Sequence, residues 1–197
     1  GGDALIGARL SDGMCDIVLS TRDGRALRFK EEKVRSVGRT ARGVRGIRLR
    51  QSDTVVAMEV IHREVVTTLV TVCDRGYGKR TPLTEYPPKG RGSLGVITIK
   101  TSERNGKVVG VCIGDELHDL MIATDAGKVI RIRVDAIPVL GRNTQGVRLI
   151  RLAAKESVVA IESLLQLAGS SDADATSSDD VISAEEQAKE LSEISKL

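Results

Sequence analysis

Short runs of apolar and β-branched residues, separated by glycine-containing turns, follow one another from residue 16 to residue 165. The first two runs, Ile17–Thr21 and Arg25–Lys30, flank Asp23-Gly24, a dipeptide that favours tight hairpin turns. Two more runs, Val44–Arg50 and Val55–Ile61, come after a basic loop that contains glycines. This pattern predicts four short antiparallel strands in the first part of the chain.

The same pattern recurs twice, at a step of 52 and then 51 residues, as the positions of Gly24, Gly76 and Gly127 show. The repeats predict further strands at Leu69–Cys73, Tyr77–Thr81, Val96–Thr101, Val108–Ile113, Leu120–Thr124, Lys128–Val134, Val147–Leu152 and Val158–Leu164. Units of four strands at this period are typical of all-β, propeller-like folds. We therefore expect a four-stranded antiparallel blade in each of residues 11–62, 63–114 and 115–165.

Both ends of the chain depart from the repeat. Residues 3–9 align with 55–61 by the same step, so we expect residues 1–10 to be the last strand of a truncated fourth blade. Residues 166–197 form an acidic tail, whose Gly/Ser/Asp-rich beginning predicts a disordered linker. Ser183-Ala-Glu-Glu186 resembles a capping box, and the apolar spacing after it predicts a short helix.

The composition excludes several kinds of function. One Phe, two Tyr and no Trp argue against modules that stack single-stranded bases on aromatic rings. No apolar run is long enough to span a bilayer and no signal peptide is visible, so we expect a cytoplasmic location and no membrane partner. Cys15, Cys73 and Cys112 match no zinc-ligand spacing and are expected to be reduced, buried thiols. His62 and His118 show no ligand or triad spacing, so we expect no catalytic residue, metal or cofactor in this segment.

The charge is distributed unevenly. Residues 166–197 carry a formal charge of −6 and the remaining residues carry +9, which favours a polyanionic partner for the body of the chain. Basic residues also recur in register, so a radial fold would align them along one rim or face. The sequence predicts that they contact the phosphates of duplex DNA, although charged residues that protect strand edges are the alternative. The candidates are Arg28, Arg39, Arg42, Arg45, Arg48, Lys79, Arg80, Lys89, Arg91, Lys100, Arg131, Arg142, Arg148 and Arg151.

Four strings of residues resemble the C-terminal domain of DNA gyrase A: 42–49, 76–81, 103–106 and 141–149. The resemblance implies a β-pinwheel, a propeller-like disc with strands exchanged between neighbouring blades. It also implies that the disc wraps duplex DNA and biases a type II topoisomerase toward negative supercoiling. The implied partners are the rest of gyrase A and the gyrase B protein in an A2B2 holoenzyme, which uses ATP and Mg²⁺ elsewhere.

Two alternatives remain open. The box that defines the family, Gln-Arg-Arg-Gly-Gly-Lys-Gly, is absent, and the loops at 38–43, 90–95 and 141–146 are degenerate equivalents. We expect the box upstream, and a protein that lacks it altogether would be closer to the A protein of topoisomerase IV. The other alternative is a propeller that binds proteins through its disc face. For the tail, we expect competition with DNA for the basic body, or else docking of Leu191, Ile194 and Leu197 on a blade.

Overall fold

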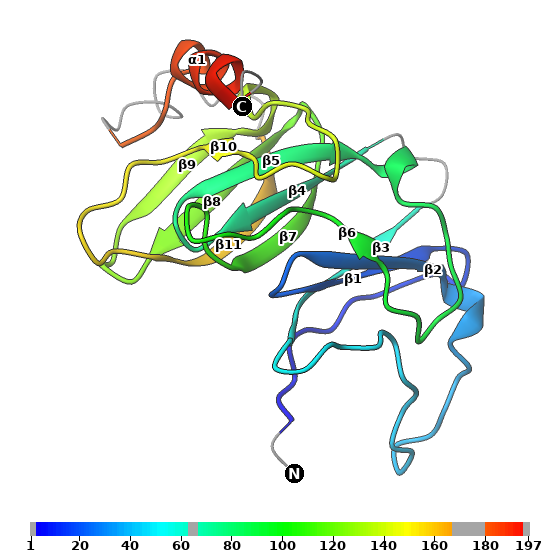
Figure 1. The fold of residues 1–197 in the computed structure, drawn as a ribbon. Coiled ribbons are helices and arrows are strands. Elements are labelled where there is room, and N and C mark those ends of the chain that lie inside the picture. The colour runs from blue at the N-terminus through cyan, green and yellow to red at the C-terminus, as the bar shows by residue number, and fades with distance from the viewer. Residues whose placement is uncertain (1–2, 63–66, 167–179, 195–197) are drawn as a thin grey trace.

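The computed structural model describes residues 3–62, 67–166 and 180–194, which form three antiparallel sheets and one helix (Figure 1). The first repeat contains β1 (Asp16–Thr21), β2 (Arg25–Lys30) and β3 (Val55–Ile61). The second contains β4 (Thr68–Cys73), β5 (Tyr77–Pro82), β6 (Val96–Ile97) and β7 (Val108–Gly114). The third contains β8 (His118–Thr124), β9 (Val129–Arg133), β10 (Val147–Arg148) and β11 (Val158–Leu165). The helix α1 spans Ala184–Ile194, and among the described residues no helix is long and apolar enough to cross a membrane.

Strands are exchanged between repeats, as the resemblance implied. The first sheet has the order β3-β1-β2-β6, so its outermost strand comes from the second repeat. The second sheet has the order β10-β5-β4-β7 and takes β10 from the third repeat. The sequence pattern had placed all four strands of a blade within one repeat, and that expectation is wrong for the third strand of each repeat. The third sheet, β11-β8-β9, has three strands among the described residues.

Several predicted strands are shorter than expected or absent. β6 and β10 are two residues long each, where the sequence pattern predicted Val96–Thr101 and Val147–Leu152. The equivalent segment of the first repeat, residues 44–50, forms no strand, because no described strand precedes β1 to pair with it. Residues 3–10 also form no strand, so the expected strand of a fourth blade is wrong for these residues.

The core lies between the sheets, because successive residues of a strand point to opposite faces. In β4, Leu69 packs with residues of the first sheet while Val70 packs with residues of the third sheet. The second sheet is therefore covered on both faces, which explains why β4 is buried along almost its whole length. All three cysteines are buried in these layers, as expected.

The exchange defines an inner and an outer edge for the sheets. The last strands of the repeats lie along the inner edge, where β7 contacts both β3 and β11. The exchanged strands β6 and β10 are at the opposite edge of their sheets. The loops that lead into β6 and β10 therefore run along the outside of the molecule (Figure 1).

The tail contains the expected helix and its capping box. The Ser183 hydroxyl accepts a hydrogen bond from the Glu186 N–H at 3.3 Å, and the Glu186 carboxylate accepts one from the Ser183 N–H at 3.2 Å. Val181 forms an antiparallel bridge with Ile150, and Leu191 packs against the core of the second and third sheets. Docking is thus present at Leu191, while Leu197, the side chain of Ile194 and the predicted linker at 167–179 lie outside the described residues.

The turn glycines provide a test of the strand exchange. Gly76 and Gly127 occupy equivalent turns with φ of +79° and +80°, so alanine at either position costs roughly 1–2 kcal/mol of backbone strain. A Cβ on Gly76 would also lie 2.9 Å from the Ile150 carbonyl oxygen of the next repeat, whereas a Cβ on Gly127 meets nothing within 4 Å. We expect Gly76→Ala to lower the free energy of unfolding by about 1–3 kcal/mol more than Gly127→Ala, measured by urea denaturation. Equal losses would contradict the packing of the exchanged strand on this turn.

Candidate nucleic-acid interface

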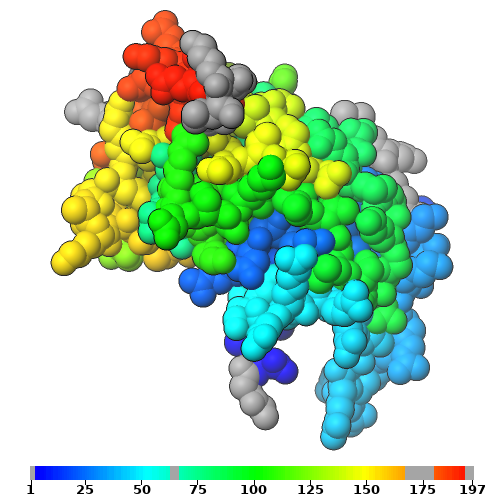
Figure 2. All heavy atoms as spheres, in the orientation of Figure 1, coloured from blue at the N-terminus to red at the C-terminus, as the bar shows by residue number. Residues whose placement is uncertain are grey.

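The most exposed basic side chains lie in the loop between β2 and β3. Arg39, Arg42, Arg45 and Arg48 are all exposed there, and the loop projects from the body of the molecule (Figure 2). Its base is fixed to the second repeat, because the Arg48 N–H donates to the Ser93 carbonyl at 2.9 Å. Lys89 and Lys100, also exposed, flank the corresponding loop of the second repeat. The two loops therefore present their basic residues on neighbouring parts of the outer edge.

Arg91 and Arg142 occupy equivalent positions and hold neighbouring loops together. The Arg91 guanidinium donates to the carbonyls of Lys33 at 3.0 Å and Arg45 at 2.5 Å. The Arg142 guanidinium donates to the Ile97 carbonyl at 3.1 Å, and the Arg142 backbone N–H donates to the Glu85 carboxylate at 3.0 Å. Both side chains are only partly exposed. They add positive charge to the outer edge while fixing the loops that carry the exposed arginines.

A second set of equivalent arginines serves the structure between and within blades. The Arg28 guanidinium is paired with Asp16 at 2.7 Å and donates to the Leu83 carbonyl of the next repeat at 3.2 Å.

In the same way, the Arg80 guanidinium donates to the carbonyls of Ile137 at 2.7 Å and Asp135 at 3.2 Å. Arg131 is paired with Asp119, the counterpart of Asp16. The guanidinium groups of Arg28, Arg80 and Arg131 are thus bound to carbonyls and carboxylates of the fold, and their contact with DNA stays a prediction.

Lys79 is the clearest correction to the predicted set, because its side chain is 0% exposed and cannot reach a phosphate. Its ammonium donates to the carbonyls of Gly141 at 2.5 Å and Arg142 at 2.9 Å, and to the Thr144 hydroxyl at 3.0 Å. Burial lowers the pKa of Lys79 from 10.5 to about 7. Lys79 thus anchors the basic loop of the third repeat from inside the second sheet.

Two of the predicted residues of the third repeat, Arg148 and Arg151, are next to the acidic tail. Glu186 is paired with Arg151, and the Glu190 carboxylate accepts a hydrogen bond from the Arg148 N–H at 2.9 Å. Glu190 is also paired with Arg104. The acidic side chains of α1 therefore lie directly on basic residues of the outer edge.

The prediction from sequence missed Arg104, whose guanidinium lies over the Tyr77 ring, 5.0 Å from its centroid. Arg148 lies over the same ring at 5.3 Å, so the two arginines form one basic cluster with Tyr77. Arg104 falls outside the register of the three trios. Arg104 does belong to Glu103-Arg-Asn-Gly106, one of the strings that resemble the gyrase family. That string was the feature of the sequence that could have pointed to Arg104.

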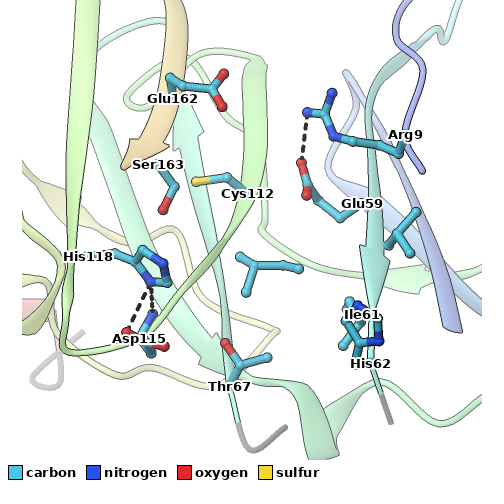
Figure 3. A pocket seen from close by; sticks show the side chains of 12 residues that line it. Arg9, Glu59, Ile61, His62, Thr67, Cys112, Asp115, His118, Glu162 and Ser163 are labelled. Atoms are coloured by element: carbon cyan, nitrogen blue, oxygen red, sulfur yellow. Dashed lines mark hydrogen bonds and ion pairs between the residues drawn. The ribbon is translucent and has the colours of Figure 1, made fainter. Parts of the chain in front are cut away.

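The inner edge is chemically different from the outer one. A cavity of about 370 Å³ opens between β3, β7 and β11, and Figure 3 shows the Arg9–Glu59 pair at 3.6 Å on one side of it. On the other side, His118 lies 3.0 Å from Asp115. Burial raises the pKa of the Glu59 carboxyl and of the Cys112 thiol, so this cavity offers no thiolate nucleophile. The side chains suited to a polyanion therefore lie outside, not here.

Comparison with known proteins gives a consistent result. The family model of the DNA gyrase C-terminal domain, a β-propeller, matches residues 16–62, 67–111 and 118–164. DNA gyrase A of Klebsiella oxytoca is 48% identical over 161 residues, which cover 82% of this chain and 18% of that protein. DNA gyrase A of Escherichia coli K12 is 44% identical over 173 residues, which cover 88% of this chain and 20% of that protein. The chain thus spans about a fifth of the length of these relatives.

Solved structures share the fold. The C-terminal domain of DNA topoisomerase IV matches with a TM-score of 0.75 at 24% identity, over 94% of this chain and 53% of that one. A DNA gyrase A C-terminal domain matches with a TM-score of 0.71 at 22% identity, over 77% of this chain and 51% of that one.

The buried position of Lys79 leads to a prediction for stability and its pH dependence. Lys79→Met removes three hydrogen bonds that hold the basic loop of the third repeat and is expected to lower the free energy of unfolding by about 1–3 kcal/mol. Between pH 7 and 10.5 the unfolded chain binds a proton at Lys79 that the folded chain does not, so wild-type stability should rise with pH across this window. The Lys79→Met variant should lack this part of the rise. Urea denaturation at several pH values measures both effects.

The control is Lys100→Met, which removes an exposed lysine and should change stability by less than about 0.5 kcal/mol. A Lys79→Met variant as stable as the control would show that the ammonium does not anchor the loop.

Proposed function

The chain belongs to the DNA gyrase C-terminal domain family, and on this premise we propose that it wraps duplex DNA around the outer edge of its blades. The observation that carries the proposal is the row of exposed basic side chains in the loop between β2 and β3 and on either side of β6. Arg42, Arg45 and Arg48 in the first repeat and Lys89 and Lys100 in the second all lie there. A curved row of point charges suits the backbone of bent DNA, whose condensed counterions it releases.

The contacts are expected to be with phosphates and not with base edges. The chain has three Phe and Tyr residues in total and no Trp. In the described part of the chain, the 3-10 turns at Glu31–Lys33, Leu83–Glu85 and Val134–Ala136 are three residues long each, and α1 belongs to the acidic tail, so no recognition helix is present on the basic loops. Phosphate contacts fix the position of the duplex without reading its sequence. Binding should therefore depend strongly on salt and weakly on sequence.

For the whole protein, we infer the A protein of a gyrase that introduces negative supercoils into DNA in an ATP-dependent manner. The partners in this proposal are the rest of gyrase A and the gyrase B protein in an A2B2 assembly, in the cytoplasm. The ATP and Mg²⁺ sites and the DNA-cleaving tyrosine belong to other regions of the assembly. This segment contributes DNA wrapping, and we assign no catalytic role to Tyr77 or Tyr86, which are buried in the sheets.

The A protein of topoisomerase IV is the second candidate, and the fold similarity to the C-terminal domain of that enzyme supports it. Gyrase is favoured because relatives at 42–49% identity carry the name of DNA gyrase A. A propeller that binds proteins is disfavoured, since the outer edge is lined with arginine and lysine and not with aromatic residues.

The salt dependence of DNA binding tests the basic loop. Because each neutralised phosphate contributes about −0.9 to the log–log slope, replacing Arg42, Arg45 and Arg48 with glutamine should flatten the slope by up to about three units. Arg45→Gln alone should flatten it by about one. Binding of a duplex of mixed sequence, measured by fluorescence anisotropy between low and moderate salt, gives the slopes.

Arg9→Gln is the matched control, because Arg9 lines the inner cavity and pairs with Glu59. Its slope should equal that of the wild-type chain. An unchanged slope for the triple variant would place the loop away from DNA, and a flattened slope for Arg9→Gln would place DNA at the inner edge.

We further propose that the tail weakens DNA binding by covering Arg104, Arg148 and Arg151. The tail contributes both kinds of contact considered from the sequence: Glu186 and Glu190 pair with arginines, while Leu191 and the buried Ile182 dock on the body. Docking keeps the acidic groups at a high local concentration beside the arginines. The two effects are separable, because different side chains carry them.

Replacing Glu186 and Glu190 with glutamine tests the electrostatic part. Glutamine preserves the capping box, so the helix should stay docked and the melting temperature should barely change. Two exposed ion pairs at ~0.2–1 kcal/mol each predict DNA binding that is roughly 2- to 30-fold tighter at low salt. The difference should fade at high salt as the Debye length shrinks.

Deleting residues 167–197 should tighten DNA binding to a similar extent and also lower the melting temperature. Unchanged affinity in the double glutamine variant would mean that the tail only stabilises the fold.

A further inference from the structure

The register of the first sheet brings a cysteine and a histidine together at its end. Asp16 of β1 is paired with Ile61 of β3. Because the strands are antiparallel, extending this pairing by one residue places Cys15 opposite His62. Neighbouring strands place such opposite residues on the same face of the sheet. A separation of 47 residues in the sequence is thereby reduced to direct contact.

Asp12 completes a compact cluster with these two residues. The Cys15 thiol donates to a carboxylate oxygen of Asp12 at 3.1 Å and lies 3.5 Å from Nδ1 of His62. The other carboxylate oxygen of Asp12 lies 3.4 Å from the same Nδ1. One ligand atom from each of the three residues can be chosen so that all lie within 4.8 Å of one another.

We propose that Asp12, Cys15 and His62 form a binding site for a single Zn²⁺ ion. Zinc binds sulfur at about 2.3 Å and nitrogen or oxygen at about 2.0–2.2 Å in a tetrahedron, which puts neighbouring ligand atoms roughly 3.3–3.6 Å apart. The separation of 3.5 Å between the Cys15 sulfur and Nδ1 of His62 matches such an edge, and each of the two atoms has an Asp12 oxygen at 3.1 and 3.4 Å respectively. Small side-chain rotations suffice to bring one oxygen, one nitrogen and one sulfur onto a common ion.

The chemistry of the three ligands selects the class of metal. A thiolate and an imidazole favour zinc or another borderline or soft divalent ion over Mg²⁺ and Ca²⁺, which prefer oxygen ligands only. Three protein ligands leave a fourth tetrahedral position for water, since Asp12 and His62 are exposed on the solvent side. When the metal binds, the Cys15 thiol releases its proton to solvent and coordinates as a thiolate. Without metal, the same S–H group donates a hydrogen bond to the Asp12 carboxylate.

The loop that carries Asp12 and Cys15 is held in place before any metal binds. The Glu31 carboxylate accepts hydrogen bonds from the N–H groups of Gly13 at 3.1 Å and Cys15 at 3.2 Å. The Met14 N–H donates to the Asp12 carboxylate at 2.9 Å, which closes the turn. Such outer contacts orient metal ligands and reduce the ordering needed on binding.

This cluster corrects the expectation that His62 has no ligand partners. The spacing of 12, 15 and 62 matches no zinc pattern, because only strand pairing brings the third residue in. The consequence of metal binding is local: the ion would tie the segment that enters β1 to the end of β3, the strand at the inner edge of the first sheet. This site is separate from the basic outer edge and does not depend on the proposed DNA contacts.

Titration of the metal-free 197-residue chain with Co²⁺ tests the site, because a cobalt–thiolate bond absorbs in the near ultraviolet. We expect one equivalent of Co²⁺ to produce this absorption and Zn²⁺ to displace it. Asp12→Asn and His62→Gln should each weaken Co²⁺ binding by at least about tenfold. Both residues are exposed, so neither change should unfold the chain.

Two further variants complete the experiment. Cys15→Ser should abolish the thiolate absorption, with circular dichroism used to verify that this buried substitution still folds. His118→Gln is the control, because His118 also lies beside a carboxylate, that of Asp115, but is not part of this cluster. Its Co²⁺ affinity should match the wild type. No thiolate absorption with the wild-type chain, or affinity unchanged in Asp12→Asn or His62→Gln, would overturn the proposal.

Discussion

The structure depends on one exchange: the third strand of the second repeat completes the first sheet, and the third strand of the third repeat completes the second sheet. β6 adds to β2 and β10 adds to β5 through backbone hydrogen bonds, so neither the first nor the second sheet is complete within its own repeat. The exchanged strands are only two residues long. Their position is therefore fixed mainly by contacts of the neighbouring residues. The backbone next to these strands lies against the turn glycines, and side chains such as Leu149 are buried. Lys79 and Arg142 also hold the loop that precedes β10 through hydrogen bonds.

This exchange also divides the basic residues into two groups with different roles. A loop that crosses from one repeat to the next leaves carbonyl oxygens at the junction, and Arg28, Arg80 and Lys79 donate hydrogen bonds to those carbonyls. The residues that the same loops carry outward, such as Arg45 and Lys100, remain exposed. A buried cation that donates three hydrogen bonds to the fold contributes more to stability than an exposed one, which interacts with water in the folded and the unfolded chain alike. Register alone could not separate the two groups.

The sequence was sufficient for the repeat and for most of the strands. Alternating apolar residues and the Asp-Gly or Arg-Gly turns located the hairpins β1–β2 and β4–β5 and the long strands β3, β7 and β11 within one or two residues. The third strands were misplaced because backbone pairing across repeats leaves no signal in local periodicity. The capping box at Ser183 was visible, whereas the bridge from Val181 to Ile150 was not. For the site, the sequence was enough to identify the exposed arginines of the loop. The burial of Lys79 and the contact of Arg104 with Tyr77 could be recognised only from the packing of the folded chain.

The tail resolves a problem that the exchange creates at the third repeat. β10 is the edge strand of the second sheet, and an open edge offers unpaired backbone groups to any extended chain. The tail covers the segment that follows β10, through the Ile150–Val181 bridge and the hydrogen bond from the Ile182 N–H to the Leu149 carbonyl at 3.0 Å. Because this pairing fixes where α1 begins, it also determines which arginines the acidic side chains reach. Those are Arg104 of the second repeat and Arg148 and Arg151 of the third repeat, while the loop with Arg42 and Arg45 stays open. The effect of the tail on a polyanion is therefore local, and it reaches only the part of the outer edge nearest to β10.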